Sequence, residues 1–175
     1  MKIKDKEFAL YLTEDKLNKR CKELGGQITA DYKDKDPLFL SVLNGSFMFL
    51  SDLIRHVEFT MEINFIKLAS YLKDKSSGAV QEIIGITGEI EGRHILVIED
   101  IVDTGTTCKY LSGKLMEKKA ASVSIAAMFL KPDVFLNQYP VKYVGFEIPN
   151  QFVVGYGLDY DGYGRNLRDL YQLKQ

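Results

Sequence analysis

One segment constrains the fold of this chain more than any other, residues 97–107. An apolar run over residues 95–98 ends in two carboxylates, a third carboxylate follows at Asp103, and a turn of small hydroxyl residues comes next. The apolar run predicts a strand buried inside a parallel sheet. Because ligands of open α/β sheets bind beyond the carboxyl ends of such strands, we expect a ligand site directly after this strand.

The turn over residues 104–107 offers backbone N–H groups and hydroxyls at the start of a helix, which suits a phosphate. The neighbouring carboxylates would repel a phosphate unless they bind ribose hydroxyls, hold a divalent cation or move a proton. A ligand with a phosphate, a sugar and a metal meets all three conditions. The dinucleotide fingerprint and the P-loop pattern are both absent from this segment. The simpler alternative is a buried strand followed by an acidic, Thr-capped helix start.

The rest of the chain alternates between strand-like and helix-like patterns. Thr13 is the expected N-cap of a helix whose apolar face holds residues 17, 21, 24 and 28, while Gly25 and Gly26 weaken its last turn. The other expected elements are strands at 38–43, 59–71, 83–86, 122–130, 143–148 and 152–155, and helices at 47–56 and 107–119. This alternation predicts an α/β fold, a central, mostly parallel twisted sheet flanked by helices, in one domain over residues 1–175. The two chain ends are expected to pack together as a small hood over the sheet.

Composition narrows the function classes. The net charge of −1 argues against a broad nucleic-acid surface. Cys21 and Cys108 lie far apart without a metal-binding spacing, which fits a reduced, cytoplasmic compartment better than a disulfide scaffold. The charged N-terminus lacks the apolar core of a signal peptide, and we expect no membrane span.

The acidic segment resembles the phosphoribosyl pyrophosphate signature of type I phosphoribosyltransferases. From about residue 38 to the C-terminus, the chain is similar to the bacterial hypoxanthine (hypoxanthine-guanine) phosphoribosyltransferases. Four blocks match in order: residues 42–45, 68–71, 97–107 and 152–159. Lys131 and Pro132 also stand where this family keeps its purine-reading lysine. The resemblance implies the type I phosphoribosyltransferase fold.

The resemblance also implies a role for each matching residue on the donor side. Asp103 would be the general acid/base and would lie beside the ribose phosphate. Glu99 and Asp100 would contact the ribose hydroxyls and, with Asp159, the metal, which is expected to be magnesium. The ribose phosphate would be bound by Thr104, Gly105, Thr106 and Thr107. Pyrophosphate would be bound by Leu43, Asn44, Gly45 and Arg165, with a non-proline cis peptide in this loop.

On the purine side, the residue types themselves suggest how a base could be bound, and the resemblance adds further roles. Phe152 could stack on a flat ring, Lys131 could donate to a ring carbonyl, and Asp159 could hold a metal. The resemblance adds Val153, which would read the purine edge through its backbone, and assigns Asp159 to the purine side as well. Ser70 and Tyr71 would close over the substrates, within a polar lid over residues 70–81.

The reaction implied is transfer of phosphoribosyl from 5-phosphoribosyl 1-pyrophosphate to hypoxanthine, and to guanine, which gives IMP or GMP and pyrophosphate. The resemblance also implies that the protein assembles as a homodimer or homotetramer. Two alternatives stay open: the same chemistry with a xanthine preference, and a phosphoribosyltransferase-fold regulator that binds nucleic acid. The complete acid set with Asp103 favours an enzyme. A phosphate-binding structural subunit is a third reading, against which the purine-side block argues.

Overall fold

The described part of the computed structural model, residues 1–70, 80–136 and 139–174, contains two β-sheets and three helices. The helices are α1 (Glu14–Tyr32), α2 (Phe47–Ile54) and α3 (Thr106–Glu117). The strands are β1 (Lys2–Ile3), β2 (Lys6–Leu12), β3 (Leu38–Leu43), β4 (Glu62–Ser70), β5 (Val80–Ile84), β6 (His94–Val102), β7 (Ser122–Leu130), β8 (Tyr143–Glu147), β9 (Val153–Val154) and β10 (Leu170–Leu173).

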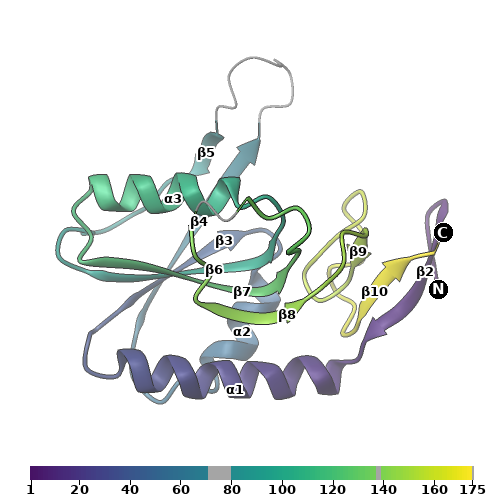
Figure 1. Cartoon of the computed structure of the whole chain (residues 1–175), viewed down its shortest axis with the longest axis horizontal. Coiled ribbons are helices and arrows are strands. Elements are labelled where there is room, and N and C mark those ends of the chain that lie inside the picture. Colours follow the sequence, from purple (N-terminus) through teal and green to yellow (C-terminus); the bar gives the residue numbers. More distant parts are fainter. Residues whose placement is uncertain (71–79, 137–138, 175) are drawn as a thin grey trace.

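The central sheet has the strand order β5-β4-β3-β6-β7-β8, in which only the β4–β5 pair is antiparallel. The apolar runs of β3, β6 and β7 form its buried middle, as expected for strands that are covered on both faces. Figure 1 shows α3 on one face and α1 and α2 on the other. The predicted fold class is therefore confirmed.

Helix α1 is longer and better supported than its glycine pair suggests. Leu17, Cys21, Leu24 and Ile28 are all fully buried, as the periodicity predicts. The helix nevertheless continues through both glycines to Tyr32. A Cβ at Gly25 would lie 2.6 Å from the Cβ of His56, so glycine at this position lets α1 approach the segment that follows α2.

The start of α1 corrects one detail of the sequence prediction. Thr13 is the N-cap residue, but its hydroxyl makes no capping hydrogen bond. The backbone N–H of Glu14 instead donates to Asp169 Oδ1 at 2.7 Å. The helix is thus capped by a carboxylate from the other end of the chain, which a local pattern does not reveal.

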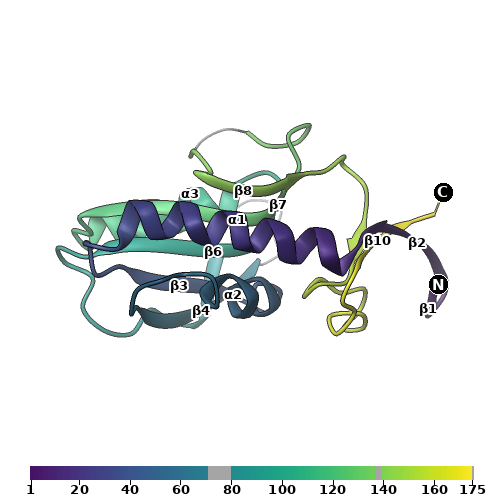
Figure 2. The same cartoon turned by 90° about the horizontal axis from the view of Figure 1, so that it is seen from below.

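The two chain ends form a second sheet, in the order β1-β2-β10-β9, with antiparallel pairs throughout. This sheet is the predicted hood, and Figures 1 and 2 place it beyond the carboxyl ends of the parallel strands. The strand expected at 152–155 is shorter, Val153–Val154, and pairs with β10. None of the described helices is long and apolar enough to cross a membrane.

Two further boundaries differ from the sequence prediction. Strand β4 begins at Glu62 and not at Phe59, whose ring packs edge-on against Phe39 at 6.3 Å between centroids. Strand β5 covers Val80–Ile84, earlier than the run expected at 83–86. At Phe59 a tertiary contact replaces the pairing that the local alternation suggested.

Candidate active site

Two neighbouring cavities lie at the carboxyl ends of the central strands. The first, of about 220 Å³, is lined by Glu99 and by residues 101–108. The second, of about 300 Å³, lies between the sheet and the hood. It is lined by Asn44, Gly45, Asp100, Ile101, Asp103, Lys131, Phe152, Val153, Leu158, Asp159 and Arg165. The structure therefore gathers most of the predicted site residues around two adjoining spaces.

The first cavity is built around the turn that starts α3. Gly105 has a φ of +83° and is the N-cap of the helix. A Cβ at this position would lie 2.6 Å from Phe135, so glycine is required by both conformation and space. The hydroxyls of Thr104 and Thr106 are 2.9 Å apart. Hydroxyls and the free N–H groups of a helix start together suit a phosphate.

The two consecutive acids of β6 point into different cavities, because side chains alternate along a strand. Glu99 lines the first cavity and Asp100 the second. Burial, with a smaller contribution from the neighbouring Asp100, raises the pKa of Glu99 well above its usual value. Burial likewise raises the pKa of Asp100 to about 6, although its Oδ1 accepts the Ile101 N–H at 2.8 Å. A cationic sugar or a metal would be a favourable partner for both groups.

A lysine and an aspartate that line the second cavity form an ion pair. Lys131 Nζ lies 2.8 Å from Asp103 Oδ1, and the side chains are 11% and 53% exposed. The backbone N–H of Lys131 donates to the carbonyl of Val102, which fixes the end of β7 beside the acidic segment. The pair thus presents an ammonium donor and a carboxylate acceptor side by side.

Phe152 faces the same cavity and is 41% exposed. Its ring packs edge-on against Tyr160 with centroids 5.8 Å apart, and at an angle against buried Phe8 at 6.3 Å. Val153 is buried in β9. Phe8 of β2 and Tyr160 therefore support the Phe152 ring beside the cavity that Lys131 also lines, where a flat ring could stack.

The loop after β3 closes the other side of the second cavity. The Leu43–Asn44 peptide bond is cis, and Asn44 and Gly45 line the cavity. A Cβ at Gly45 would lie 1.4 Å from Asp100 Oδ2, so the loop touches the acidic strand directly. Leu43 itself ends β3 and is not among the lining residues of this cavity.

Arg165 and Asp159 face one another at the hood end of this cavity. Arg165 Nη2 lies 2.5 Å from Asp159 Oδ1, and Arg165 Nη1 donates to the carbonyl of Gly157 at 2.8 Å. Asp159 Oδ2 accepts the Gly162 N–H at 2.7 Å. Each carboxylate oxygen keeps one lone pair, and the side chain is 28% exposed.

These oxygens fit the partial ligand set that magnesium prefers. Mg²⁺ is usually held by one or two carboxylates together with waters and substrate phosphates. Asp100 and Asp159 line one cavity, whereas Glu99 lies in the other. Within residues 1–70, 80–136 and 139–174, no group of three or more His, Cys, Asp or Glu could hold a metal. The donor set is thus suited to a metal that arrives with a phosphorylated substrate.

Some predicted positions lie outside this geometry, and some lining residues were missed. Tyr71 and most of the predicted lid over 70–81 fall outside the described residues, and only the backbone of Ser70, at the end of β4, is described. Ile101 and Leu158 line the second cavity without having been predicted. Their signal was available, because each lies inside a recognised block, between residues already assigned to the site.

Comparison with known proteins assigns the family. The model of the phosphoribosyl transferase domain matches residues 11–161. The chain belongs to the phosphoribosyltransferase family. The hypoxanthine-guanine phosphoribosyltransferase of Lactococcus lactis subsp. lactis is 43% identical over 159 residues, which cover 90% of this chain and 86% of the relative.

Solved phosphoribosyltransferase structures agree with the fold. A hypoxanthine phosphoribosyltransferase from Staphylococcus aureus matches with a TM-score of 0.88 and 42% identity, covering 95% of this chain and 92% of that one. The hypoxanthine phosphoribosyl transferase of Trypanosoma cruzi matches with a TM-score of 0.89 and 34% identity, covering 99% and 95%.

Proposed function

We propose that this protein is a purine salvage enzyme that transfers phosphoribosyl from its pyrophosphate donor to hypoxanthine and guanine, which releases pyrophosphate. The observation that carries this proposal is the Lys131–Asp103 pair at 2.8 Å, facing the cavity that also holds Phe152. A six-oxopurine presents its O6 acceptor next to N7 on one edge. The ammonium matches O6, and the carboxylate matches the proton of N7–H.

The same pair argues against adenine as an acceptor. Adenine carries an amino donor where hypoxanthine carries O6, and lysine can only donate. An adenine ring in this cavity would therefore place two donors against each other. Guanine and xanthine share O6 and N7 with hypoxanthine, so selection among these three depends on groups other than Lys131.

The bond changes follow from these positions. The bond from ribose C1′ to the pyrophosphate oxygen breaks, the bond from purine N9 to C1′ forms, and the N7 proton passes to Asp103. Glu99 and Asp100 stabilise positive charge on the sugar, since carboxylates in a partly dry site interact strongly with a developing cation. The turn at 104–107 holds the ribose phosphate, and Arg165 with residues 43–45 binds the pyrophosphate.

Magnesium would be held by Asp159 and Asp100 together with the donor, and it would supply charge neutralisation for the leaving pyrophosphate. Asp159 can take this role beside Arg165, because each of its oxygens has a single partner and keeps one lone pair for the metal. Arg165 would then exchange part of this contact for a pyrophosphate oxygen. Both oxygens of Asp159 stay oriented by the Gly162 N–H and Arg165.

We also propose that the protein acts in the cytoplasm as a homodimer or homotetramer. The two cysteines are free and buried, which suits a reducing compartment. For the Trypanosoma cruzi relative, the C-terminal region has been connected with oligomeric state and enzymatic activity. Sedimentation equilibrium would test the oligomeric state of this chain.

The test of function is an absorbance assay with the pyrophosphate donor and magnesium, run in parallel with hypoxanthine, guanine, xanthine and adenine. We expect turnover of hypoxanthine and guanine and little with adenine.

Lys131→Met should lower the preference for hypoxanthine over adenine by at least about tenfold, since a hydrogen bond from a charged donor contributes about 1.5–3 kcal/mol. Xanthine as the preferred substrate would support the same chemistry with another base. If folded protein shows no turnover and binds RNA or DNA at moderate salt, the proposal of an enzyme is wrong and a nucleic-acid-binding regulator is favoured.

A further inference from the structure

The purine-side segment and the pyrophosphate loop come into backbone contact at Gly157 and Gly45. A Cβ at Gly157 would lie 2.0 Å from the carbonyl oxygen of Gly45, and a Cβ at Gly45 would overlap Asp100. The loop at Gly45 thus lies against the backbone of the purine-side segment and against the Asp100 carboxylate, with no room for a side chain of its own. Any shift of the segment over residues 152–159 changes its distance from the loop that is proposed to hold the leaving group.

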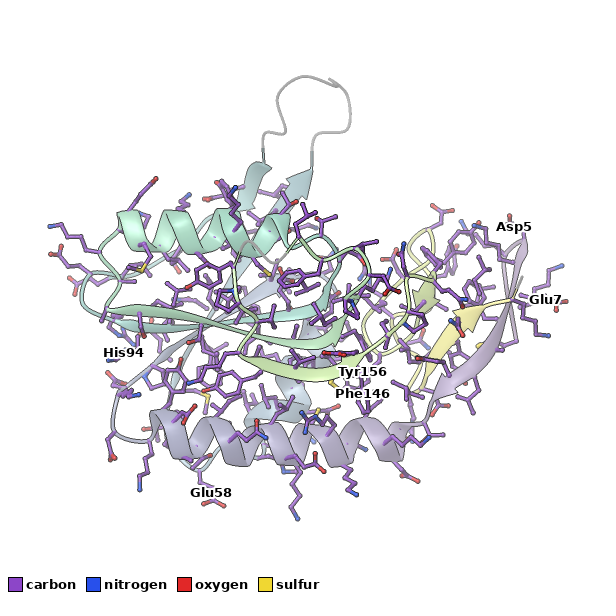
Figure 3. All side chains as sticks on the ribbon, viewed as in Figure 1. Asp5, Glu7, Glu58, His94, Phe146 and Tyr156 are labelled. Atoms are coloured by element: carbon purple, nitrogen blue, oxygen red, sulfur yellow. The ribbon has the colours of Figure 1, made fainter. Side chains whose placement is uncertain are left out.

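The residue beside this contact points away from the cavity. Tyr156 has a φ of +49° and lies between Gly155 and Gly157, whose φ values are +103° and +95°. Its side chain is buried in the core on the α1 side of the sheet, as Figure 3 shows. Three successive residues in this conformation turn the aromatic ring inward while the rest of the segment faces the substrate cavity.

The hydroxyl of Tyr156 is bonded to the helix that follows the pyrophosphate loop. It donates to Asp52 Oδ2 of α2 at 2.7 Å and lies 3.3 Å from Cys21 Sγ of α1. Burial raises the pKa of Cys21 to about 11, so its thiol keeps its proton and can donate to the phenol oxygen. A chain of bonds from Cys21 through Tyr156 to Asp52 is stronger than isolated contacts.

We propose that the Tyr156–Asp52 hydrogen bond is a positioning clamp that sets the distance between the purine-binding segment and the pyrophosphate loop. Asp52 lies on α2, which begins two residues after Gly45, and Tyr156 directly precedes Gly157. The bond therefore ties α2 to the segment that Gly45 contacts: Tyr156 is one residue before Gly157, and Asp52 is seven residues after Gly45 on the helix that continues from the loop. Neither side chain lines the substrate cavity, so both act through the backbone that they hold.

The clamp predicts a defect in chemistry and not in binding. Purine would still meet Lys131 and Phe152, and the donor would still meet the turn at 104–107. Only the approach of N9 to C1′ would loosen, and a misplacement of about 1 Å can cost about 100-fold in rate. This inference rests on the proposed phosphoribosyl transfer.

The test is the single-turnover rate of wild type and Tyr156→Phe, with enzyme in excess over hypoxanthine and saturating donor. We expect a fall of about 10- to 100-fold, while the dissociation constants of donor and nucleotide product change by less than about threefold. Asp52→Ala should show the same fall, and the double variant should add little to either. Asp52→Asn keeps an oxygen acceptor and should lose much less.

The matched control is Tyr143→Phe. The Tyr143 hydroxyl is also buried and donates to an aspartate, Asp31 Oδ2, at 2.6 Å, but the pair joins α1 to β8 away from the cavities. Both Phe variants should lose similar thermal stability, and only Tyr156→Phe should lose rate. Equal rates in the two variants would overturn the clamp.

Three further outcomes of these experiments also bear on the clamp. If Tyr156→Phe does not fold, Asp52→Ala decides, because Asp52 borders an open cavity of about 590 Å³ and its truncation leaves no sealed hole. A loss of donor or product binding that matches the loss of rate would also overturn the clamp. If wild type itself transfers phosphoribosyl to no six-oxopurine, the proposed function fails, whatever the variants do.

Discussion

A single methyl group at Gly45 should inactivate the enzyme. A Cβ there would lie 1.4 Å from Asp100 Oδ2, 2.6 Å from Asp100 Cγ and 3.3 Å from Asp100 Cβ. Real Cβ contacts essentially never fall below 3.0 Å, so the loop and the carboxylate must separate by about 1.6 Å. The loop is also held at Gly157, where an added Cβ would lie 2.0 Å from the Gly45 carbonyl oxygen.

The displacement sets the expected magnitude for Gly45→Ala. Shifting a catalytic contact by about 1 Å can cost about 100-fold, so a shift of this size predicts at least about a 100-fold fall in kcat/KM. Overpacking costs about 1–3 kcal/mol in well-packed sites, which the fold should survive. The loss should therefore be one of activity in a protein that still unfolds cooperatively.

The assay is steady-state turnover of hypoxanthine, together with thermal unfolding. Gly26→Ala is the matched control, since Gly26 lies in α1 and a Cβ at this position would have no atom within 4 Å. That variant should keep full activity and gain about 0.5–1 kcal/mol of stability. A Gly45→Ala enzyme within twofold of wild-type kcat/KM would refute the steric argument.

The same geometry supports three further predictions. Asp103→Asn should lower the single-turnover rate by about 100- to 10,000-fold with little change in stability, because the carboxylate is half exposed; wild-type turnover would remove Asp103 as the base. Burial raises the pKa of Asp100 from 3.8 to about 6, so the folded state binds this proton more tightly than the unfolded chain, and the carboxyl destabilises the fold increasingly as pH rises from about 4 through 6. Asp100→Asn should therefore raise Tm at pH 8 and hardly change it at pH 4, and an equal shift at both would contradict this account. Gly25→Ala should lower the free energy of unfolding by about 1–3 kcal/mol, because its Cβ would collide with His56. Denaturant unfolding of this variant, with Gly26→Ala as the control, would measure the loss.

Much of the fold follows from patterns that are local in the sequence. The apolar run before Glu99 predicts a buried strand, and the turn that follows predicts a helix start, because strand periodicity and helix-start chemistry depend on neighbouring residues. Both expectations are confirmed by β6 and α3. The alternation of such units predicts the parallel sheet, since a parallel pair needs a crossover connection.

The boundaries and caps were less accessible to the same reasoning. Thr13 has the right residue type for a cap, yet Asp169 makes the bond, from 155 residues away. Gly25 suggests a helix end, yet it marks a close approach of α1 to His56. In each case the local pattern has two physical explanations, and only the partner that packs against it distinguishes them.

The order of residues already specifies which chemical groups this protein brings to its candidate site, because the acidic strand, the turn at 104–107 and the block at 152–159 are each contiguous. How those groups face one another is set by the packed fold. It joins Lys131 to Asp103 and places Gly157 against Gly45. These contacts join segments far apart in the chain, and they are fixed by the packing of the sheet, α2 and the hood, which no single segment encodes.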